Sequence, residues 1–181
     1  MTYQNSPIGK GYVQVYTGNG KGKTTAALGL AFRAMGRGLK TYIGQFMKGQ
    51  LYGELHAAEM TDNHITIEQY GKDTFIHIKN PPAAEDVLMA QAGLAKARQA
   101  MFSKQYSIVV LDEICTAHFF HLITTGEMLE MIDQKPDGVE LIFTGRYAPK
   151  ELLDKANLVT EMTEIKHYYP QGITARDGIE R

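Results

Sequence analysis

The sequence has little cysteine, no long apolar run and no excess of charge of either sign. Its 181 residues include a single cysteine, Cys115, which excludes an internal disulfide and a zinc site built from several cysteines. No apolar stretch approaches the roughly 20 residues of a membrane-spanning helix, and the N-terminus lacks the apolar core of a signal peptide. These absences predict a cytoplasmic protein with no membrane partner.

The charge of the chain is nearly balanced, with a formal net charge of −1 and a pI near 6.6. Such a balance gives no electrostatic reason to expect a nucleic-acid partner. The 44% hydrophobic and 22% charged residues are ordinary for a globular protein. We therefore expect a single domain over residues 1–181, with irregular termini at 1–11 and about 168–181.

The most informative stretch is a glycine-rich turn between an alternating apolar run at 12–16 and an alanine-rich helical pattern at 26–31. It reads Thr17-Gly18-Asn19-Gly20-Lys21-Gly22-Lys23-Thr24-Thr25. A strand, a glycine-rich turn and Gly-Lys-Thr at the start of a helix are the arrangement of a phosphate-binding loop. Glycines let backbone N–H groups turn inward around phosphates, and the positive end of the helix points to the same place. We expect residues 18–25 to bind phosphates, with Lys23 bridging phosphate oxygens and the Thr24 hydroxyl holding a magnesium ion.

The loop departs from the common pattern because Thr17 stands where that pattern has its first glycine, so the spacing is one residue shorter. A glycine-rich connection with an accidental Gly-Lys-Thr is the alternative. Three glycines between a strand and a helix favour phosphate binding. Lys21 should also face phosphate, and a solvated loop lysine is the other interpretation of that residue.

The rest of the chain alternates between strand and helix patterns. We expect further strands at 40–47, 64–70, 106–113, 139–144 and 158–165, and helices at 23–35, 53–60, 84–103, 116–132 with a break near Thr125-Gly126, and 149–155. This order predicts an α/β fold of three layers, the P-loop NTPase (RecA-like) fold, with a mostly parallel sheet of five to six strands. In such sheets ligands bind at the carboxyl ends of the strands.

Polar residues follow several of the expected strands. Asp112-Glu113 ends an apolar strand, and we expect one acid to hold magnesium together with Thr24 while the other polarises water or positions a partner. A solvated acidic strand end is the alternative. Arg146 is a candidate for phosphate or nucleotide binding, although a surface salt bridge would explain it equally well. Gln45 and Lys48 are weaker candidates at the end of the second strand.

Two groups of residues have weaker functional interpretations. His118 and His121 lie near Cys115 on an expected helix and allow a metal site, but packing or surface roles are commoner for histidines beside phenylalanines. Phe75 and His77 lie in a short apolar segment outside regular structure. They are candidates for contact with a flat ligand, and core packing is the alternative for Phe75.

Nearly the whole chain resembles one family, the ATP:corrinoid adenosyltransferases. The shortened Gly-Asn-Gly-Lys-Gly-Lys-Thr loop is far more specific than a generic phosphate-binding loop. The matching segments are 13–27, Gln45-Phe46-Met47-Lys48-Gly49, 109–113, Thr144-Gly145-Arg146-Tyr147-Ala148-Pro149, 159–162, 165–167, 172–173 and 175–179.

The resemblance implies an enzyme of cobalamin biosynthesis or salvage. Cobalt(I) of a corrinoid, cob(I)yrinic acid a,c-diamide or cob(I)alamin, would attack the ribose C5′ of ATP and expel triphosphate. Members of the family are understood to hold the nucleotide in the reversed sense, so that the loop grips the triphosphate as a leaving group. The reduced cobalt is already a strong nucleophile, so the reaction needs no general base. The protein's tasks would be alignment, charge neutralisation by Lys21, Lys23 and magnesium, and shielding of the cobalt from water.

By position, the resemblance implies that residues 19–25 bind triphosphate and that Glu113 or Asp112 assists the metal with Thr24. Phe75 would lie where the family places aromatic residues near the lower face of the corrin. Some members have a tryptophan close to that phenylalanine and a longer N-terminal segment. This chain has no tryptophan, and about eleven residues precede its first expected strand. The resemblance further implies a homodimer and an electron-donating flavoprotein as partner.

Two other functions share the phosphate-binding loop. A P-loop phosphotransferase or NTP hydrolase, such as a nucleoside kinase, would release ADP with phosphate or with a phosphorylated acceptor. A RecA-like ATPase module acting on nucleic acid is a third interpretation, and the near-neutral charge counts against it.

Overall fold

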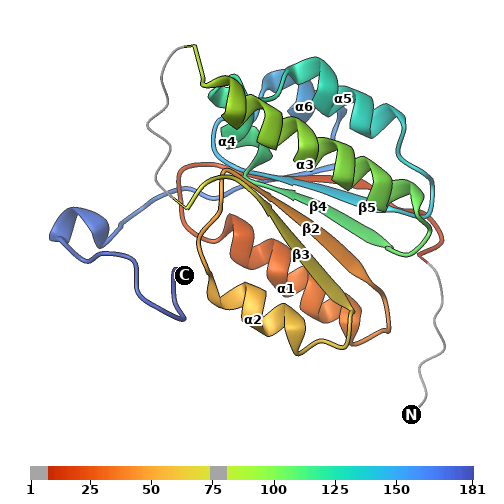
Figure 1. Cartoon of the computed structure of the whole chain (residues 1–181), viewed down its shortest axis with the longest axis horizontal. Coiled ribbons are helices and arrows are strands. Elements are labelled where there is room, and N and C mark those ends of the chain that lie inside the picture. Colours follow the sequence, from red (N-terminus) through yellow and green to blue (C-terminus); the bar gives the residue numbers. More distant parts are fainter. Residues whose placement is uncertain (1–7, 74–80) are drawn as a thin grey trace.

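A computed structural model describes residues 8–73 and 81–181, which form a six-stranded parallel sheet with helices on both faces (Figure 1). The strand order is β3-β2-β4-β5-β1-β6. The expected α/β class and three-layer architecture are therefore confirmed. The strands are β1 (Val13–Thr17), β2 (Thr41–Phe46), β3 (Ile65–Tyr70), β4 (Ile108–Asp112), β5 (Glu140–Thr144) and β6 (Leu158–Glu161).

The helices divide between the two faces of the sheet. Figure 1 shows α1 (Lys23–Met35) and α2 (Gly53–Glu59) below the sheet, and α3 (Ala84–Phe102), α4 (Ile114–Phe119), α5 (Thr125–Asp133) and α6 (Lys150–Lys155) above it. Helices on both faces are expected, because right-handed crossovers between parallel strands place helices on either side.

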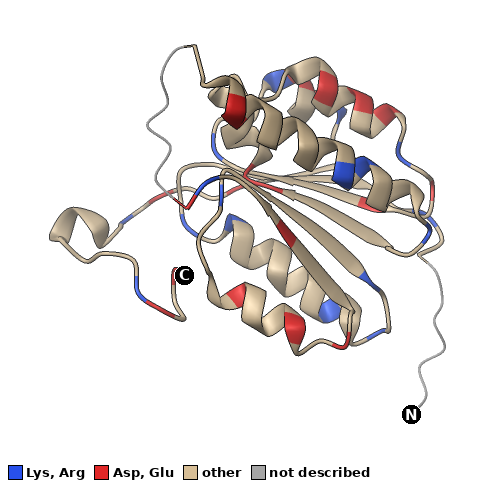
Figure 2. Ribbon diagram, viewed as in Figure 1, with Lys and Arg blue, Asp and Glu red and all other residues tan. Residues whose placement is uncertain are grey.

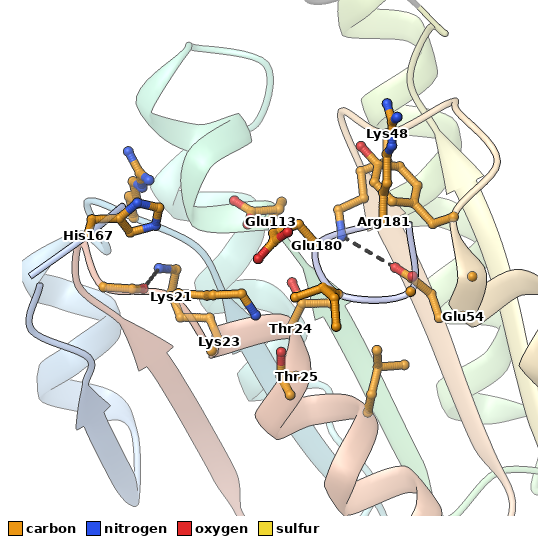
Figure 3. A pocket seen from close by; sticks show the side chains of 18 of the residues that line it. Lys21, Lys23, Thr24, Thr25, Lys48, Glu54, Glu113, His167, Glu180 and Arg181 are labelled. Carbon is orange, nitrogen blue, oxygen red and sulfur yellow. Dashed lines mark hydrogen bonds and ion pairs between the residues drawn. The ribbon is translucent and has the colours of Figure 1, made fainter. Parts of the chain in front are cut away.

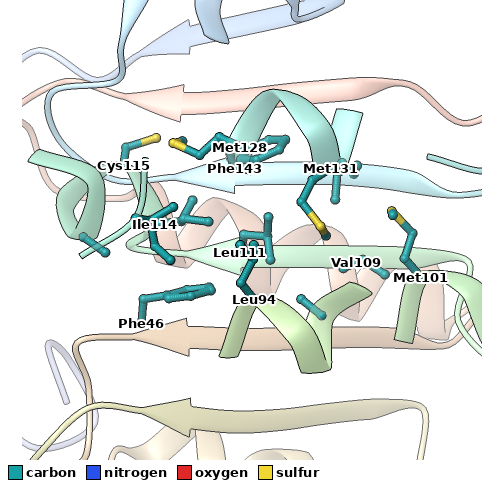
Figure 4. Packing of buried hydrophobic residues seen from close by; sticks show 14 of the residues in the cluster. Phe46, Leu94, Met101, Val109, Leu111, Ile114, Cys115, Met128, Met131 and Phe143 are labelled. Carbon is teal, nitrogen blue, oxygen red and sulfur yellow. The ribbon is translucent and has the colours of Figure 1, made fainter. Parts of the chain in front are cut away.

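The core has one apolar cluster on each face of the sheet. Figure 4 shows the larger cluster, in which α3, α4 and α5 pack on β2, β4 and β5. The smaller cluster packs α1 against the other face of the same strands. Strand β4 is buried at every position, which explains its unbroken apolar run, whereas the edge strand β6 is exposed along its length. The central strands therefore give the site a rigid base.

The expected break in the helical region at 116–132 is present, and the bound of the last strand differs from the structure. The break lies just before Thr125 because Thr124 caps α5: its side chain accepts from the Glu127 N–H, and the Glu127 carboxylate accepts from the Thr124 N–H. The last strand ends at Glu161, four residues early, and the chain then runs out in a tail that contains one short 3₁₀ turn, Tyr169–Gln171.

The expectation about membranes can be compared with the helices directly. Within residues 8–73 and 81–181, no helix combines the length and apolarity that crossing a bilayer requires. Acidic and basic residues are interspersed along the elements (Figure 2).

Candidate functional site

The glycine-rich loop between β1 and α1 is shaped by close contact with the end of β6. Gly18 has a φ of +93°, and a Cβ there would lie 2.5 Å from the carbonyl oxygen of Met162. The Gly20 N–H donates to that same oxygen at 2.6 Å. Gly22, with a φ of +118°, precedes the first residue of α1. Only glycine fits the first and last of these positions without backbone strain, so the loop requires its unusual composition.

Lys23 is buried at the first position of α1, with 6% of its surface exposed. Its Nζ donates to the carbonyl oxygens of Gly18 and Gly20, each at 2.7 Å. Burial lowers the pKa of the Lys23 ammonium; Glu113 opposes this shift and Arg146 adds to it. The Lys23 ammonium is thus held inside the loop by two backbone carbonyl oxygens. An anionic ligand bound in the loop would be a stronger partner for it than these neutral groups.

Asp112 joins three segments at the carboxyl end of β4. Its fully buried carboxylate accepts from the Thr24 hydroxyl at 2.9 Å and the Thr144 hydroxyl at 2.7 Å on Oδ1, and from Lys48 Nζ at 2.8 Å on Oδ2. The ends of β2, β4 and β5 and the start of α1 therefore converge, as parallel strands in one sheet require.

Glu113 leaves the strand in a different direction from Asp112. Its backbone has a φ of +62°, and its N–H donates to Thr144 Oγ1 at 2.9 Å. The Thr116 hydroxyl donates to its carboxylate. Glu113 lines an open pocket, whereas Asp112 lies behind it. The two adjacent acids are therefore placed for different tasks.

The pocket has a volume of about 650 Å³, within the range of small-molecule sites. Figure 3 shows charged side chains around it from the glycine-rich loop, from α2, from the segments that follow β2 and β4, and from the tail. Its lining consists of Asn19, Gly20, Lys21, Gly22, Lys23, Thr24, Thr25, Leu28, Lys48, Tyr52, Gly53, Glu54, Glu113, Arg146, His167, Gly178, Ile179, Glu180 and Arg181.

Comparison with known proteins decides the family. The family described as ATP:corrinoid adenosyltransferase BtuR/CobO/CobP matches residues 9–181. The chain belongs to this family. A corrinoid adenosyltransferase of a Sinorhizobium species is 35% identical over 175 residues, which cover 94% of this chain and 80% of that protein. Corrinoid adenosyltransferases of Escherichia coli K12, 30% identical, and Pseudomonas aeruginosa, 29% identical, are covered to 86% and 84% of their length, each over 94% of this chain.

Most of the residues expected to bind the nucleotide line the pocket. Lys21 and Arg146 are exposed on its wall, and the Arg146 N–H donates to Thr116 Oγ1 at 3.1 Å. Gln45 is fully buried behind the wall, where its amide donates to Glu54 Oε1 at 2.9 Å, so it supports the pocket residues. Phe75 and His77 lie outside the described residues.

The group around Cys115 runs from the interior to the surface, because Cys115 is buried, His118 is half-buried and His121 is exposed. His118 Nε2 lies 2.8 Å from Thr125 Oγ1, and burial lowers the pKa of His118, with a further contribution from His121. Cys115 is fully buried, and burial, followed by Glu113, raises the pKa of its thiol to about 12. Across residues 8–73 and 81–181, no three His, Cys, Asp or Glu side chains gather in a way that could hold a metal ion. The contact of His118 with Thr125 and the exposure of His121 fit packing and surface roles, respectively.

Sequence reasoning missed the far end of the pocket in this family member. Tyr52 and Glu54 come from α2 and the residue before it, and Gly178–Arg181 come from the tail. In the sequence, both segments lie away from the carboxyl ends of the strands, where ligands are expected in parallel sheets. The resemblance to the family already included residues 175–179, but no pattern in these residues predicted that the tail lies against the pocket.

Proposed function

We propose that this chain transfers the 5′-deoxyadenosyl group of ATP to the cobalt(I) of a reduced corrinoid and releases triphosphate. Membership of the ATP:corrinoid adenosyltransferase family supports an ATP-dependent enzyme that acts on a corrinoid. The curated relatives in Sinorhizobium and E. coli carry the name corrinoid adenosyltransferase.

The observation that carries the proposal is the continuity of the glycine-rich loop with Glu113, Lys48 and Arg146 in one pocket. The loop supplies the buried Lys23 ammonium, which the carbonyl oxygens of Gly18 and Gly20 hold at the start of α1. An ammonium and a helix N-terminus are groups that bind phosphate oxygens. Lys21 and Arg146 add positive charge on the pocket wall. A pocket of about 650 Å³ has room for a nucleotide beyond its phosphates.

The residues of the pocket act mainly by binding and orientation. Lys23 and the loop amides would neutralise and align the triphosphate, and Lys21 and Arg146 would fix its outer oxygens. The nucleotide would lie in the reversed sense, with its triphosphate held as the leaving group. No proton transfer is required, because the cobalt(I) substrate supplies the electron pair that attacks C5′.

The donor set also fits a magnesium ion. The Thr24 hydroxyl and the Asp112 carboxylate are 2.9 Å apart, and the Glu113 carboxylate faces the same pocket. Oxygen ligands with phosphate as a further partner are what magnesium prefers. Thr24 with Asp112 or Glu113 would hold it, and the bound ion would supply positive charge to the phosphate oxygens.

Further parts of the proposal concern partners and setting. Phe75 would contact the lower face of the corrin. The enzyme would work as a cytoplasmic homodimer and receive electrons from a flavoprotein. A nucleic-acid partner is not expected, since the chain has a formal net charge of −1.

One experiment tests the activity against its main rivals. Protein, MgATP and chemically reduced cobalamin are incubated without oxygen, and the products are followed by the absorbance of adenosylated cobalamin and by anion-exchange chromatography. We expect adenosylcobalamin and intact triphosphate in equal amounts, and only when reduced cobalamin is present. Release of ADP and phosphate instead would identify a phosphotransferase or hydrolase and would overturn the proposal.

A further inference from the structure

Lys48 follows β2 and is held against the buried end of the pocket. Its Nζ lies 2.8 Å from Asp112 Oδ2 and 3.9 Å from Glu54 Oε1, and 16% of its side chain is exposed. The ammonium also lies 5.3 Å from the centre of the Tyr52 ring. Figure 3 shows it between Glu113 and Glu54, directed into the pocket. A lysine with these partners has one defined position, unlike a solvated lysine.

The backbone fixes this position as well. Met47, one residue earlier, has a φ of +59°, a conformation that a methionine rarely adopts. One residue later, a Cβ on Gly49 would lie 2.4 Å from the carbonyl oxygen of Gly71. The loops after β2 and β3 are therefore in direct contact, and the backbone of Lys48 packs against the loop after β3.

The ion pair leaves Lys48 with unused donors. An ammonium has three N–H groups, and within residues 8–73 and 81–181 its one hydrogen bond is to Asp112. The Asp112 carboxylate already accepts from Thr24 and Thr144 on its other oxygen. The remaining N–H groups of Lys48 are therefore available to an anionic atom in the pocket, which Lys48 lines.

Lys48 and the glycine-rich loop approach the pocket from opposite sides of Asp112. Thr24 contacts Oδ1 and Lys48 contacts Oδ2, so Lys48 lies beyond the Thr24 hydroxyl, on the β2 side. In ordinary P-loop enzymes the terminal phosphate is the one that meets the metal and the acids after this strand. With the nucleotide reversed, as the proposed function has it, the α-phosphate and its 5′ oxygen occupy that place.

We propose that Lys48 is a catalytic residue that stabilises the charge developing on the 5′ oxygen of ATP. In the reaction, the electron pair of cobalt(I) forms the cobalt–C5′ bond, and cobalt is oxidised to cobalt(III). The C5′–oxygen bond breaks, its electron pair stays on the oxygen, and that oxygen leaves as part of triphosphate. The oxygen is an uncharged ester in ATP and is charged in triphosphate. A cation placed there binds the product-like state more tightly than the substrate, and such a difference accelerates the reaction. This inference rests on the proposed function.

The test compares the affinity of the protein for ATP with its affinity for inorganic triphosphate, in the presence of magnesium, by calorimetry without corrinoid. A charge-assisted hydrogen bond contributes about 1.5–3 kcal/mol, which corresponds to roughly tenfold or more in affinity. Lys48→Met should therefore weaken triphosphate about tenfold or more, and ATP less than about threefold. In turnover, kcat should fall by about tenfold or more while the KM for ATP changes little.

Two controls make the comparison specific. Lys23→Met should weaken both ligands by similar factors, because Lys23 faces oxygens that are charged in both. Lys150→Met removes an exposed ion pair with Asp154 away from the pocket and should change neither affinity. Equal weakening of ATP and triphosphate in Lys48→Met would overturn the proposal.

Lys48→Met leaves a buried carboxylate without its cation and so endangers folding. The double variant Lys48→Met/Asp112→Asn removes that charge, and Asp112→Asn alone is its reference. The double variant should again lose affinity for triphosphate selectively, and an unchanged ratio would overturn the proposal. If the wild-type protein makes no adenosylcobalamin, the proposed function fails. If it makes adenosylcobalamin but the ratio is unchanged, only the role of Lys48 fails.

Discussion

The two ends of the pocket are built in different ways. At the loop end, Gly20 is hydrogen-bonded to Met162 beside the sheet, and Asp112 is buried beneath hydroxyls and an ammonium. At the tail end, Gly178–Arg181 form a turn tied mainly by tail residues, with Arg176 and Tyr168 donating to Glu180 and Arg181 donating to Asp177. Within the described part of the tail, from 165 onward, the recorded hydrogen bonds and ion pairs join tail residues to one another.

This difference indicates that the loop half of the ligand site is preorganised, whereas the tail half is held by fewer and weaker contacts with the rest of the protein. The ion pairs of the tail are open to solvent on at least one side, with Arg176 51% and Asp177 89% exposed. Such pairs contribute about 0–1 kcal/mol each, whereas breaking a buried polar network costs several times as much. We therefore expect the triphosphate to bind to a preorganised loop, and the nucleoside to stabilise the position of the tail. Substitutions at the loop end should affect chemistry, and substitutions at the tail end should affect nucleotide binding.

The largest effect is expected at the loop end, from Lys23→Ala. The leaving triphosphate loses the buried cation that bridges the loop, so turnover with ATP and reduced cobalamin should fall by at least about 10²–10³-fold. The measurement is the rate of adenosylcobalamin formation, with circular dichroism as a control for folding. Near-normal activity would contradict the assignment of the loop to the triphosphate.

The second-largest effect is expected from Glu113→Ala, at the boundary between the preorganised loop half and the open pocket. Loss of this carboxylate should raise the magnesium concentration needed for half-maximal turnover by about tenfold, because an oxygen ligand beside the phosphates is removed. Affinity for the corrinoid, followed by its absorbance, should remain. Equal loss of the magnesium response and of corrinoid binding would mean that Glu113 has a structural role and does not act as a metal ligand.

The same contrast explains what the sequence could predict. The helix at 23–35 and the apolar strand that ends at Asp112 are encoded locally, by periodicity and β-branched runs. The helix has the expected bounds, and the strand, Ile108–Asp112, is shorter than the expected 106–113. The different directions of Asp112 and Glu113 depend on one positive φ and on Thr144, which lies 31 residues after Glu113 on another strand. No local pattern reveals either feature. The position of Gly178–Arg181 against Gly53 depends on long-range docking of a segment without helix or strand periodicity.

A smaller effect is expected at the tail end, from Glu180→Ala. Its carboxylate accepts from the N–H, Nε and Nη2 of Arg176 and so closes the turn that reaches the pocket. Without it, the KM for ATP should rise by several-fold with kcat nearly unchanged. The melting temperature should change little, since the Arg176 side of the ion pair is 51% exposed and the contacts of Glu180 lie within the tail. Asp154→Ala breaks an exposed pair with Lys150 outside the pocket and is the matched control. A fall in kcat without a change in KM would mean that the tail contributes to the chemical step and not to nucleotide binding.

The smallest effect is expected from a cysteine introduced in the tail, whose rate of alkylation can be compared with that of the buried Cys115. Cys115 is fully buried and the pKa of its thiol is raised to about 12, chiefly by burial, so the reactive thiolate is scarce at pH 8 and alkylation by iodoacetamide should be very slow. Ile179 is 58% exposed on the pocket wall, so Ile179→Cys should introduce a thiol that reacts readily. Mass spectrometry follows both sites in one protein, and Cys115 is the internal control. MgATP should slow alkylation at position 179 several-fold and leave Cys115 unchanged, because the nucleoside would lie against the tail. Rapid alkylation at 179 that MgATP does not slow would show that the tail stays apart from the nucleotide and would confine the ligand site to the half built on the sheet.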